Sequence, residues 1–184
     1  MKLWLLRHAQ VALPPGVCYG ASDVPAHADL TQAAAEATAP LLPHGAPLWV
    51  SALGRAGQLA EVVHSLRPDL QPPHADARLN EMHFGQWEMQ PWNAIPRNAF
   101  DAWMADFPHH RFGGTESTQQ VIDRVASALQ DLRGKGHSEA VWVTHAGVIR
   151  AVSYLALHGN RPIQAVNEWP VDAPAPGGHV CVTL

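Results

Sequence analysis

The chain has 184 residues, of which 47% are hydrophobic and 15% are charged, and its formal net charge is −4 with neutral histidines. This composition is too apolar for a disordered chain and too often interrupted by Pro and Gly for a coiled coil, so we expect one domain over residues 1–184. The 12 Lys and Arg residues form no run, which excludes the basic surface of proteins that bind nucleic acids or anionic membranes.

The cysteines and the N-terminus predict where the protein works. Cys18 and Cys181 are far apart and form no C-x-x-C pair, which disfavours a zinc ribbon, a redox dithiol and a disulfide scaffold. The apolar start of the chain is interrupted at Arg7 and His8, too early for a signal peptide or a membrane segment. We therefore expect a cytoplasmic protein with no nucleic-acid or membrane partner. No oligomeric state follows from the sequence.

Short apolar runs alternate with amphipathic patterns, which are typical of buried strands and of helices respectively. The predicted elements, in chain order, are strand Leu3–Leu6, helix Thr31–Leu42, strand Pro47–Ala52, helix Arg55–Leu66, helix Ser117–Leu132, strand Ala140–Thr144, helix Val148–Leu157 and strand His179–Leu184. Thr31 is a possible N-cap, and Ser117 with Gln120 has the spacing of a capping box. Parallel strands joined by helical crossovers give a three-layer α/β/α sandwich with a mostly parallel central sheet.

Two stretches interrupt this alternation. Residues 81–114 contain three Trp and three Pro, which predicts an excursion of short helices and loops beside the site. Two interpretations remain open for Trp87, Trp92 and Trp103, which either cap the core or stack on a flat substrate. Prolines and glycines in residues 160–178 predict a long surface connection before the last strand.

Reactive side chains follow the ends of the predicted strands. The first strand ends in Arg7 and His8, the second leads to Arg55 at a helix start, and the third ends before His145. Ligands of open α/β sheets bind at the carboxyl ends of the strands, so we expect these four side chains to converge on one site.

Four stretches, in order, resemble motifs of the histidine phosphatase superfamily, which has the phosphoglycerate mutase-like fold. They are Leu5–Ala9, Ser51–Ala56, Leu79–Glu88 and Val143–Arg150. The resemblance implies hydrolysis of a small-molecule phosphomonoester through a phosphohistidine on His8. It also implies that Arg7 and Arg55 hold the phosphoryl oxygens and that His145 donates to them, without metal or cofactor.

The same resemblance assigns the leaving-group proton to Glu81, as general acid and then general base. Glu88 is the nearby alternative carboxylate. Gln10 and Ala146 are implied to contact the substrate. The pair His109–His110 carries no completed set of metal ligands, so a metal site there is disfavoured.

The substrate is suggested by a further stretch. Ala9 and Pro14 stand where the family usually has Gly and Asn, which weakens a sugar-phosphate mutase assignment. Gly16–Pro25 resembles the α-ribazole phosphatase branch, which implies action on α-ribazole 5′-phosphate in cobalamin nucleotide-loop assembly. The alternatives are a phosphoglycerate mutase, a broad-specificity sugar or nucleotide phosphatase, and a phosphoester-binding module without turnover.

Overall fold

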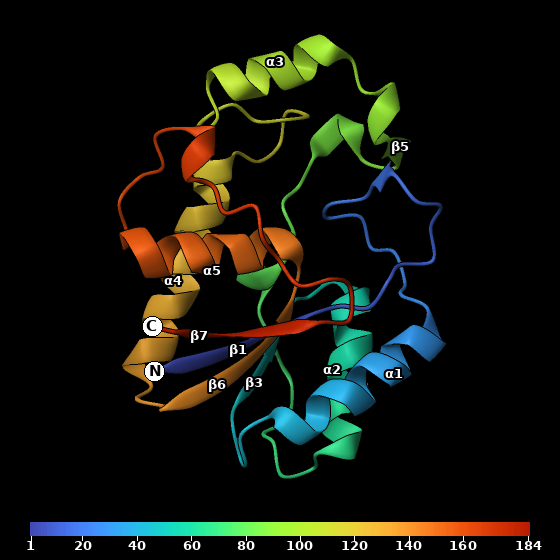
Figure 1. Ribbon diagram of the computed structural model, residues 1–184, viewed down its shortest axis with the longest axis vertical. Helices are drawn as coiled ribbons and strands as arrows, with labels where there is room; N and C mark the ends of the chain where they lie inside the picture. Colours follow the sequence, from blue (N-terminus) through green and yellow to red (C-terminus); the bar gives the residue numbers. More distant parts are fainter.

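The computed structural model describes all 184 residues and contains a central sheet of five strands in the order β4-β3-β6-β1-β7. The strands are β1 (Lys2–Arg7), β3 (Leu48–Val50), β4 (His74–Ala75), β6 (Glu139–Thr144) and β7 (His179–Thr183). All neighbouring pairs are parallel except β1 with β7. The two termini therefore lie side by side (Figure 1). The Leu184 amide donates to the Met1 carbonyl at 2.8 Å, and the Met1 ammonium donates to the Leu184 carbonyl at 2.9 Å.

Helices cover both faces of the sheet, as the three-layer prediction requires. The main helices are α1 (Ala28–Thr38), α2 (Gly54–Leu66), α3 (Arg97–Ala105), α4 (Thr118–Gly134) and α5 (Ala146–His158). Side chains alternate along each strand, so Leu5 packs with α4 and α5 while Leu6 packs with α1 and α2. The central strands are consequently buried on both faces, which explains their continuous apolar runs.

The structure corrects the first predicted helix. It begins at Ala28 and ends at Thr38, and a short 3-10 turn over Ala39–Leu41 follows it. Thr31 is not the N-cap, because its hydroxyl donates to the His27 carbonyl one turn earlier from inside the helix. The capping box at Ser117 is present, since its side chain and that of Gln120 each accept a backbone amide.

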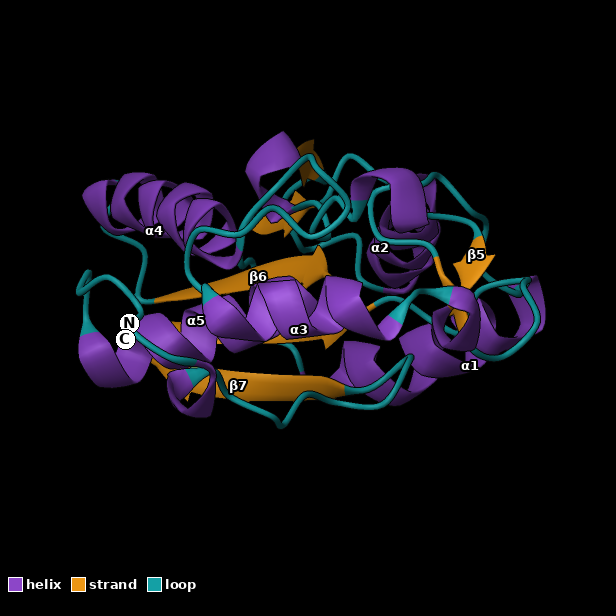
Figure 2. Cartoon of the chain, turned by 90° about the horizontal axis from the view of Figure 1, so that it is seen from above, coloured by secondary structure: helices purple, strands orange, loops and turns teal.

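The excursion over residues 81–114 is confirmed as short helices and turns. Its main element, α3, has no buried residue and stands at one end of the molecule (Figure 1), crossing in front of the strands when seen from above (Figure 2). A two-stranded ribbon joins this segment to the N-terminal loops through β2 (Val17–Cys18) and β5 (Gln90–Pro91). The ribbon thus ties the excursion to the loops that follow β1, near the carboxyl ends of the central strands.

Aromatic rings hold this excursion together. Phe112 is fully buried, and Trp87, Trp92 and Trp103 lie around it with ring centroids 6.1, 6.3 and 4.5 Å away. This packing favours the interpretation that the three tryptophans cap a core, and a contact between them and a substrate stays a prediction. No helix of the chain is both long and apolar enough to span a bilayer.

Candidate functional site

The candidate site lies at the carboxyl ends of β1 and β6. Arg7 is the last residue of β1 and pairs in register with Thr144, the last residue of β6. Each strand is followed at once by a histidine, so the parallel register brings His8 and His145 together with ring centroids 5.0 Å apart. Both rings are buried, with exposures of 2% and 0%. The predicted convergence of these residues is therefore present.

One ring nitrogen of His8 is engaged in a hydrogen bond with the backbone. Its Nδ1 lies 2.7 Å from the carbonyl oxygen of Ala9, an acceptor only, so Nδ1 carries the proton and Nε2 has a free lone pair. Burial lowers the pKa of His8 to about 3, and the charges of Arg55 and Arg7 act in the same direction. The imidazole is therefore neutral at physiological pH, as a nucleophile must be.

His145 is oriented by a chain of hydrogen bonds. The Asn80 Oδ1 accepts a hydrogen bond from the Ala52 amide at 2.8 Å, which identifies this atom as the amide oxygen of the side chain. The Ser51 hydroxyl lies 2.8 Å from the same oxygen and therefore donates to it. The His145 Nε2, 2.7 Å from the Ser51 Oγ, then donates to that hydroxyl. Its Nδ1 is buried and has no partner. Burial, and next the charge of Arg55, hold the pKa of His145 well below its usual value.

Arg55 is fully buried at the start of α2. Its Nη1 and Nη2 donate to the carbonyls of Ser22 and Gly20 at 2.8 and 2.5 Å, and its guanidinium lies 5.0 Å from the ring centre of Tyr19. Burial lowers the pKa of Arg55, while neighbouring acidic groups, Glu81 foremost, raise it. The loop over residues 19–22 thus fixes the guanidinium, a role that the sequence did not reveal.

Arg7 is fixed from the opposite end of the chain. Its Nη1 donates to the Pro174 carbonyl at 2.8 Å, and the Gly177 amide donates to the backbone carbonyls of Arg7 and His8. The stretch predicted only as a surface connection therefore ends against the site.

Three buried polar atoms here have no partner: the Nε of Arg7, the Nε of Arg55 and the Nδ1 of His145. Buried polar groups in native proteins are almost always hydrogen-bonded, so such a group of orphans marks a place for a ligand. Two of the three are cationic donors, and the ligand they fit is an anion with several acceptor oxygens. We call the side chains of Arg7, His8, Arg55 and His145 the cradle.

Glu81 lies beside the cradle, at the start of α5. Its Oε2 accepts from the Gly147 amide at 3.1 Å and its Oε1 from the Met82 amide at 3.0 Å. A Cβ at position 147 would overlap the Glu81 carboxylate, so the glycine permits this close approach. The motif that contains Gly147 thus serves the carboxylate as well as the histidine before it.

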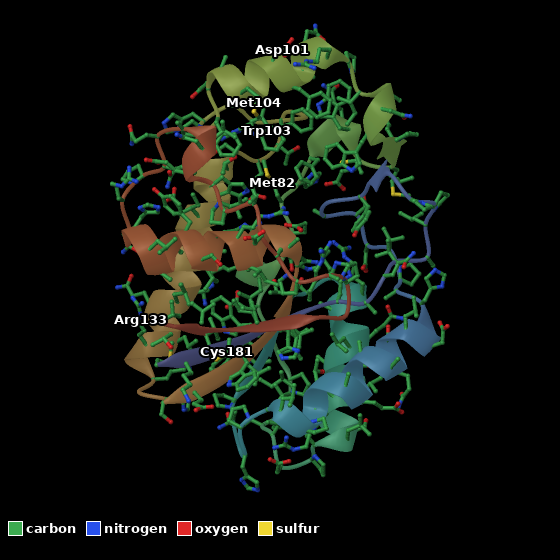
Figure 3. All side chains as sticks on the ribbon, viewed as in Figure 1. Met82, Asp101, Trp103, Met104, Arg133 and Cys181 are labelled. Atoms are coloured by element: carbon green, nitrogen blue, oxygen red, sulfur yellow. The ribbon has the colours of Figure 1, made fainter.

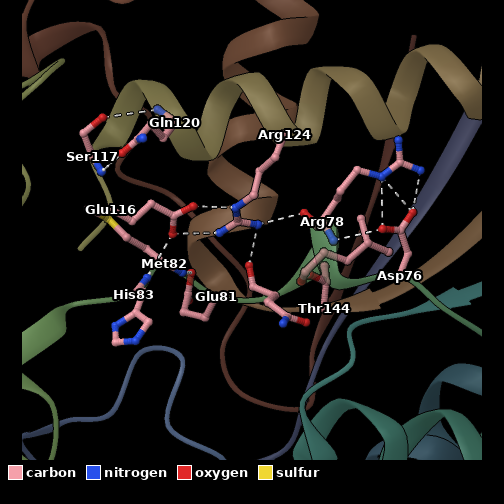
Figure 4. Close-up of polar contacts among 12 residues, drawn as sticks. Asp76, Arg78, Glu81, Met82, His83, Glu116, Ser117, Gln120, Arg124 and Thr144 are labelled. Atoms are coloured by element: carbon pink, nitrogen blue, oxygen red, sulfur yellow. Dashed lines mark hydrogen bonds and ion pairs between the residues drawn. The ribbon is translucent and has the colours of Figure 1, made fainter.

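A polar network supports the segment that carries Glu81 (Figure 4). Arg124 of α4 donates at 2.7 Å to the carbonyls of Arg78 and Asn80, and Glu116 both pairs with Arg124 and accepts from the His83 amide. Arg124 and Glu116 lie in no motif noted in the sequence. Only their contacts reveal that they fix the backbone around Glu81.

The two remaining predicted residues differ in position. Gln10 is exposed and its side chain makes no hydrogen bond, while its carbonyl accepts from the His27 amide at 2.9 Å. Ala146 is buried and opens α5, where backbone amides have no intrahelical acceptor. No group of three or more His, Cys, Asp or Glu side chains is placed to hold a metal ion.

A small cavity of about 100 Å³ adjoins Glu81 and Gly147, with apolar walls that include Phe84, Trp103 and Trp169. Figure 3 labels Trp103, on α3, and Met82, which lies below α3 in that view, and both side chains line this cavity. The indole nitrogen of Trp103 is buried without a partner. Glu81 also borders a wider opening of about 390 Å³. The carboxylate is therefore reachable from outside the cradle.

Comparisons with known proteins show the family and the fold. The family model described as histidine phosphatase superfamily (branch 1) matches residues 3–176. A phosphoglycerate mutase from Thermus thermophilus is 30% identical, with a TM-score of 0.73 over 99% of this chain and 92% of that one. A mycobacterial glucosyl-3-phosphoglycerate phosphatase, 23% identical, shares the fold with a TM-score of 0.81 over 98% and 88% of the two chains.

Among curated proteins, one of Hydrogenobacter thermophilus, provisionally named phosphoserine phosphatase 2, is 29% identical over 80 residues. The match covers 42% of this chain and 39% of that relative, so this chain spans less than half of the relative's length.

Proposed function

This chain belongs to branch 1 of the histidine phosphatase superfamily, and we propose that it hydrolyses small phosphomonoesters through a phosphohistidine on His8. The observation that carries the proposal is the group of unpartnered atoms in the cradle, Arg7 Nε, Arg55 Nε and His145 Nδ1, beside an imidazole with a free Nε2. A phosphoryl group is an anion with several acceptor oxygens, the kind of ligand that these cationic donors bind.

In the first step, the neutral His8 Nε2 attacks phosphorus and the ester oxygen leaves, so a P–N bond replaces the P–O bond. The two arginines spread charge over the phosphoryl oxygens without losing their protons. Phosphoryl transfer needs positioning and electrostatic stabilisation above all, which the guanidinium groups of Arg7 and Arg55 supply because backbone carbonyls orient them.

His145 responds to the same charge. Its Nε2 proton is committed to Ser51, so donation to the phosphoryl group requires a second proton on Nδ1. A phosphoryl dianion beside Nδ1 raises the pKa of His145 and so favours that proton. The residue then stabilises the charge that develops during transfer.

Glu81 completes the cycle. Its carboxyl gives a proton to the leaving alkoxide and then takes one from the water that attacks phosphohistidine, which releases phosphate. Its contacts with the cavity and with the wider opening support this role, since alcohol and water both have to reach it.

For the organic part of the substrate, we propose α-ribazole 5′-phosphate. The resemblance of Gly16–Pro25 to that branch supports it, as does the aromatic wall around Phe84 and Trp103, which suits a flat heterocycle. The relatives named for phosphoglycerate and phosphoserine make those compounds the competing substrates.

The test is phosphate release from a panel containing α-ribazole 5′-phosphate, 3-phosphoglycerate, phosphoserine and sugar phosphates, with and without EDTA. We expect turnover that EDTA does not change, with the highest kcat/KM for α-ribazole 5′-phosphate. A strong preference for 3-phosphoglycerate would overturn the substrate, and phosphoryl transfer faster than phosphate release would identify a mutase. A phosphoester that raises the Tm without being consumed would indicate a binding module instead.

A further inference from the structure

Glu88 is a buried carboxylate that the reaction scheme does not use. It lies seven residues after Glu81, and its side chain is only 8% exposed. Burial of a charged group is costly unless hydrogen bonds compensate for it, so the partners of Glu88 indicate what the carboxylate is for.

Those partners belong to two separate segments. The Glu88 Oε1 accepts from the Ala21 amide and from the Phe84 amide, each at 2.9 Å, and its Oε2 accepts a short hydrogen bond from the Ser22 hydroxyl. His83 covers the carboxylate, with its Nδ1 3.1 Å from Oε1. One side chain therefore ties the loop over residues 20–22 to the chain just after Glu81.

The loop on one side of this tie is the one that holds Arg55. Its guanidinium donates to the carbonyls of Gly20 and Ser22, which flank the amide of Ala21 that Glu88 binds. Gly20 has a φ of +37°, and a Cβ there would come within 2.6 Å of Glu88 Oε1. The loop and the carboxylate are therefore packed too closely for either to shift alone.

We propose that Glu88 is a positioning residue. It fixes the phosphate-binding guanidinium of Arg55 through the 20–22 loop and holds that loop in a fixed position relative to the segment that carries Glu81. This inference rests on the proposed function, because it assigns to Arg55 the binding of a phosphoryl group. Glu88 touches neither substrate nor the reacting atoms. Glu88 acts on the reacting atoms through the loop carbonyls that bind Arg55. Its removal therefore leaves the Arg55 guanidinium present but displaced.

The test compares variants by their affinity for orthovanadate, a phosphoryl analogue, measured by titration calorimetry. Glu88→Ala leaves the 20–22 loop without its acceptor, and we expect the Kd to rise about 10- to 100-fold. Glu88→Gln keeps an acceptor for the two amides and offers its NH₂ to Ser22, so we expect a Kd within about threefold of wild type.

A double-mutant cycle shows whether the effect passes through Arg55. In an Arg55→Ala background, Glu88→Ala should change the Kd by less than about twofold, because the group it positions is already gone. The matched control is Asp69→Ala, which removes a carboxylate bonded to the Gly45 amide and to Arg67, at the opposite end of β3. It should lower the Tm while leaving the Kd unchanged.

Two readouts separate this inference from the proposed function. Wild-type protein that binds no orthovanadate would overturn the proposed function. A crystal structure of Glu88→Ala with the Arg55 guanidinium still on the carbonyls of Gly20 and Ser22 would overturn the role of Glu88, as would an unchanged Kd in that variant. A displaced 20–22 loop with a raised Kd, rescued by Glu88→Gln, supports it.

Discussion

The cradle and the excursion over residues 81–114 are neighbouring regions built by opposite means. The cradle sits at the ends of buried parallel strands, and its charged groups are fixed by carbonyls from distant parts of the chain. The excursion holds together through stacked aromatic rings, and its helix α3 buries no residue. Rigid placement of charge thus goes with the sheet, while the wall of the cavity beside Glu81 is part of an aromatic cluster.

This contrast teaches which substitutions stop the chemistry and which only redirect it. A change in the cradle alters a group whose position the sheet fixes, so every substrate is affected alike. On the proposed function, a change in the excursion alters contacts to the organic group, so we expect its effect to differ between substrates.

The largest effect is expected from His8→Ala. The variant lacks the atom that bonds to phosphorus, and we expect kcat to fall at least about a thousandfold for every substrate in the panel. His44→Ala is the control, because that side chain is 90% exposed and lies just before β3, at the opposite end of that strand from the cradle. Normal hydrolysis by His8→Ala would show that His8 is not the nucleophile and would contradict the role assigned to the cradle.

Arg55→Lys should have the next largest effect. Lysine keeps the charge but cannot reach both loop carbonyls and the phosphoryl group with a planar fork, so we expect kcat/KM to fall about a hundredfold. Arg67→Lys is a matched control, since Arg67 also donates to two carbonyls, those of Ala39 and Leu42, away from the site. Equal losses in both variants would show that the effect is on folding alone.

Trp103→Phe tests the second region. The ring still packs on Phe112, but the cavity beside Glu81 loses its indole N–H, so we expect kcat/KM to change about three- to tenfold, unequally across the panel. Trp92→Phe alters the same aromatic cluster without bordering that cavity and should leave the preference order intact. A uniform loss for all substrates would contradict the division between the two regions.

The smallest expected effect is a change in the pH dependence of stability. The pKa of His8 is about 3 in the folded protein, below its usual 6.5 when unfolded, so between these values only the unfolded chain binds the proton. Stability is therefore unaffected by His8 above pH 6.5 and falls as the pH drops toward 3. Denaturant unfolding at pH 7.5 and 5 should show a smaller loss for His8→Asn than for wild type. An equal loss would mean that His8 is charged in the folded state.

The sequence predicted the cradle better than its supports, for a physical reason. The residues Arg7, His8 and His145 follow buried strands, and strand ends converge in any parallel sheet, so periodicity alone places them. Arg55 contacts the loop carbonyls of Gly20 and Ser22, and Arg124 those of Arg78 and Asn80, which no side-chain pattern encodes. Thr31 shows a related limit of sequence patterns. A threonine near a helix start resembles an N-cap, but the helix begins at Ala28 with His27 as its N-cap residue.

The most direct test of the central claim is capture of the intermediate. Wild-type protein mixed with a ³²P-labelled phosphoester for milliseconds and quenched in alkali, where phosphohistidine survives, should carry label that acid removes. Mass spectrometry should place that label on His8, and Arg67→Lys should be labelled equally. Turnover without labelled protein, or label on any other residue, would contradict the account.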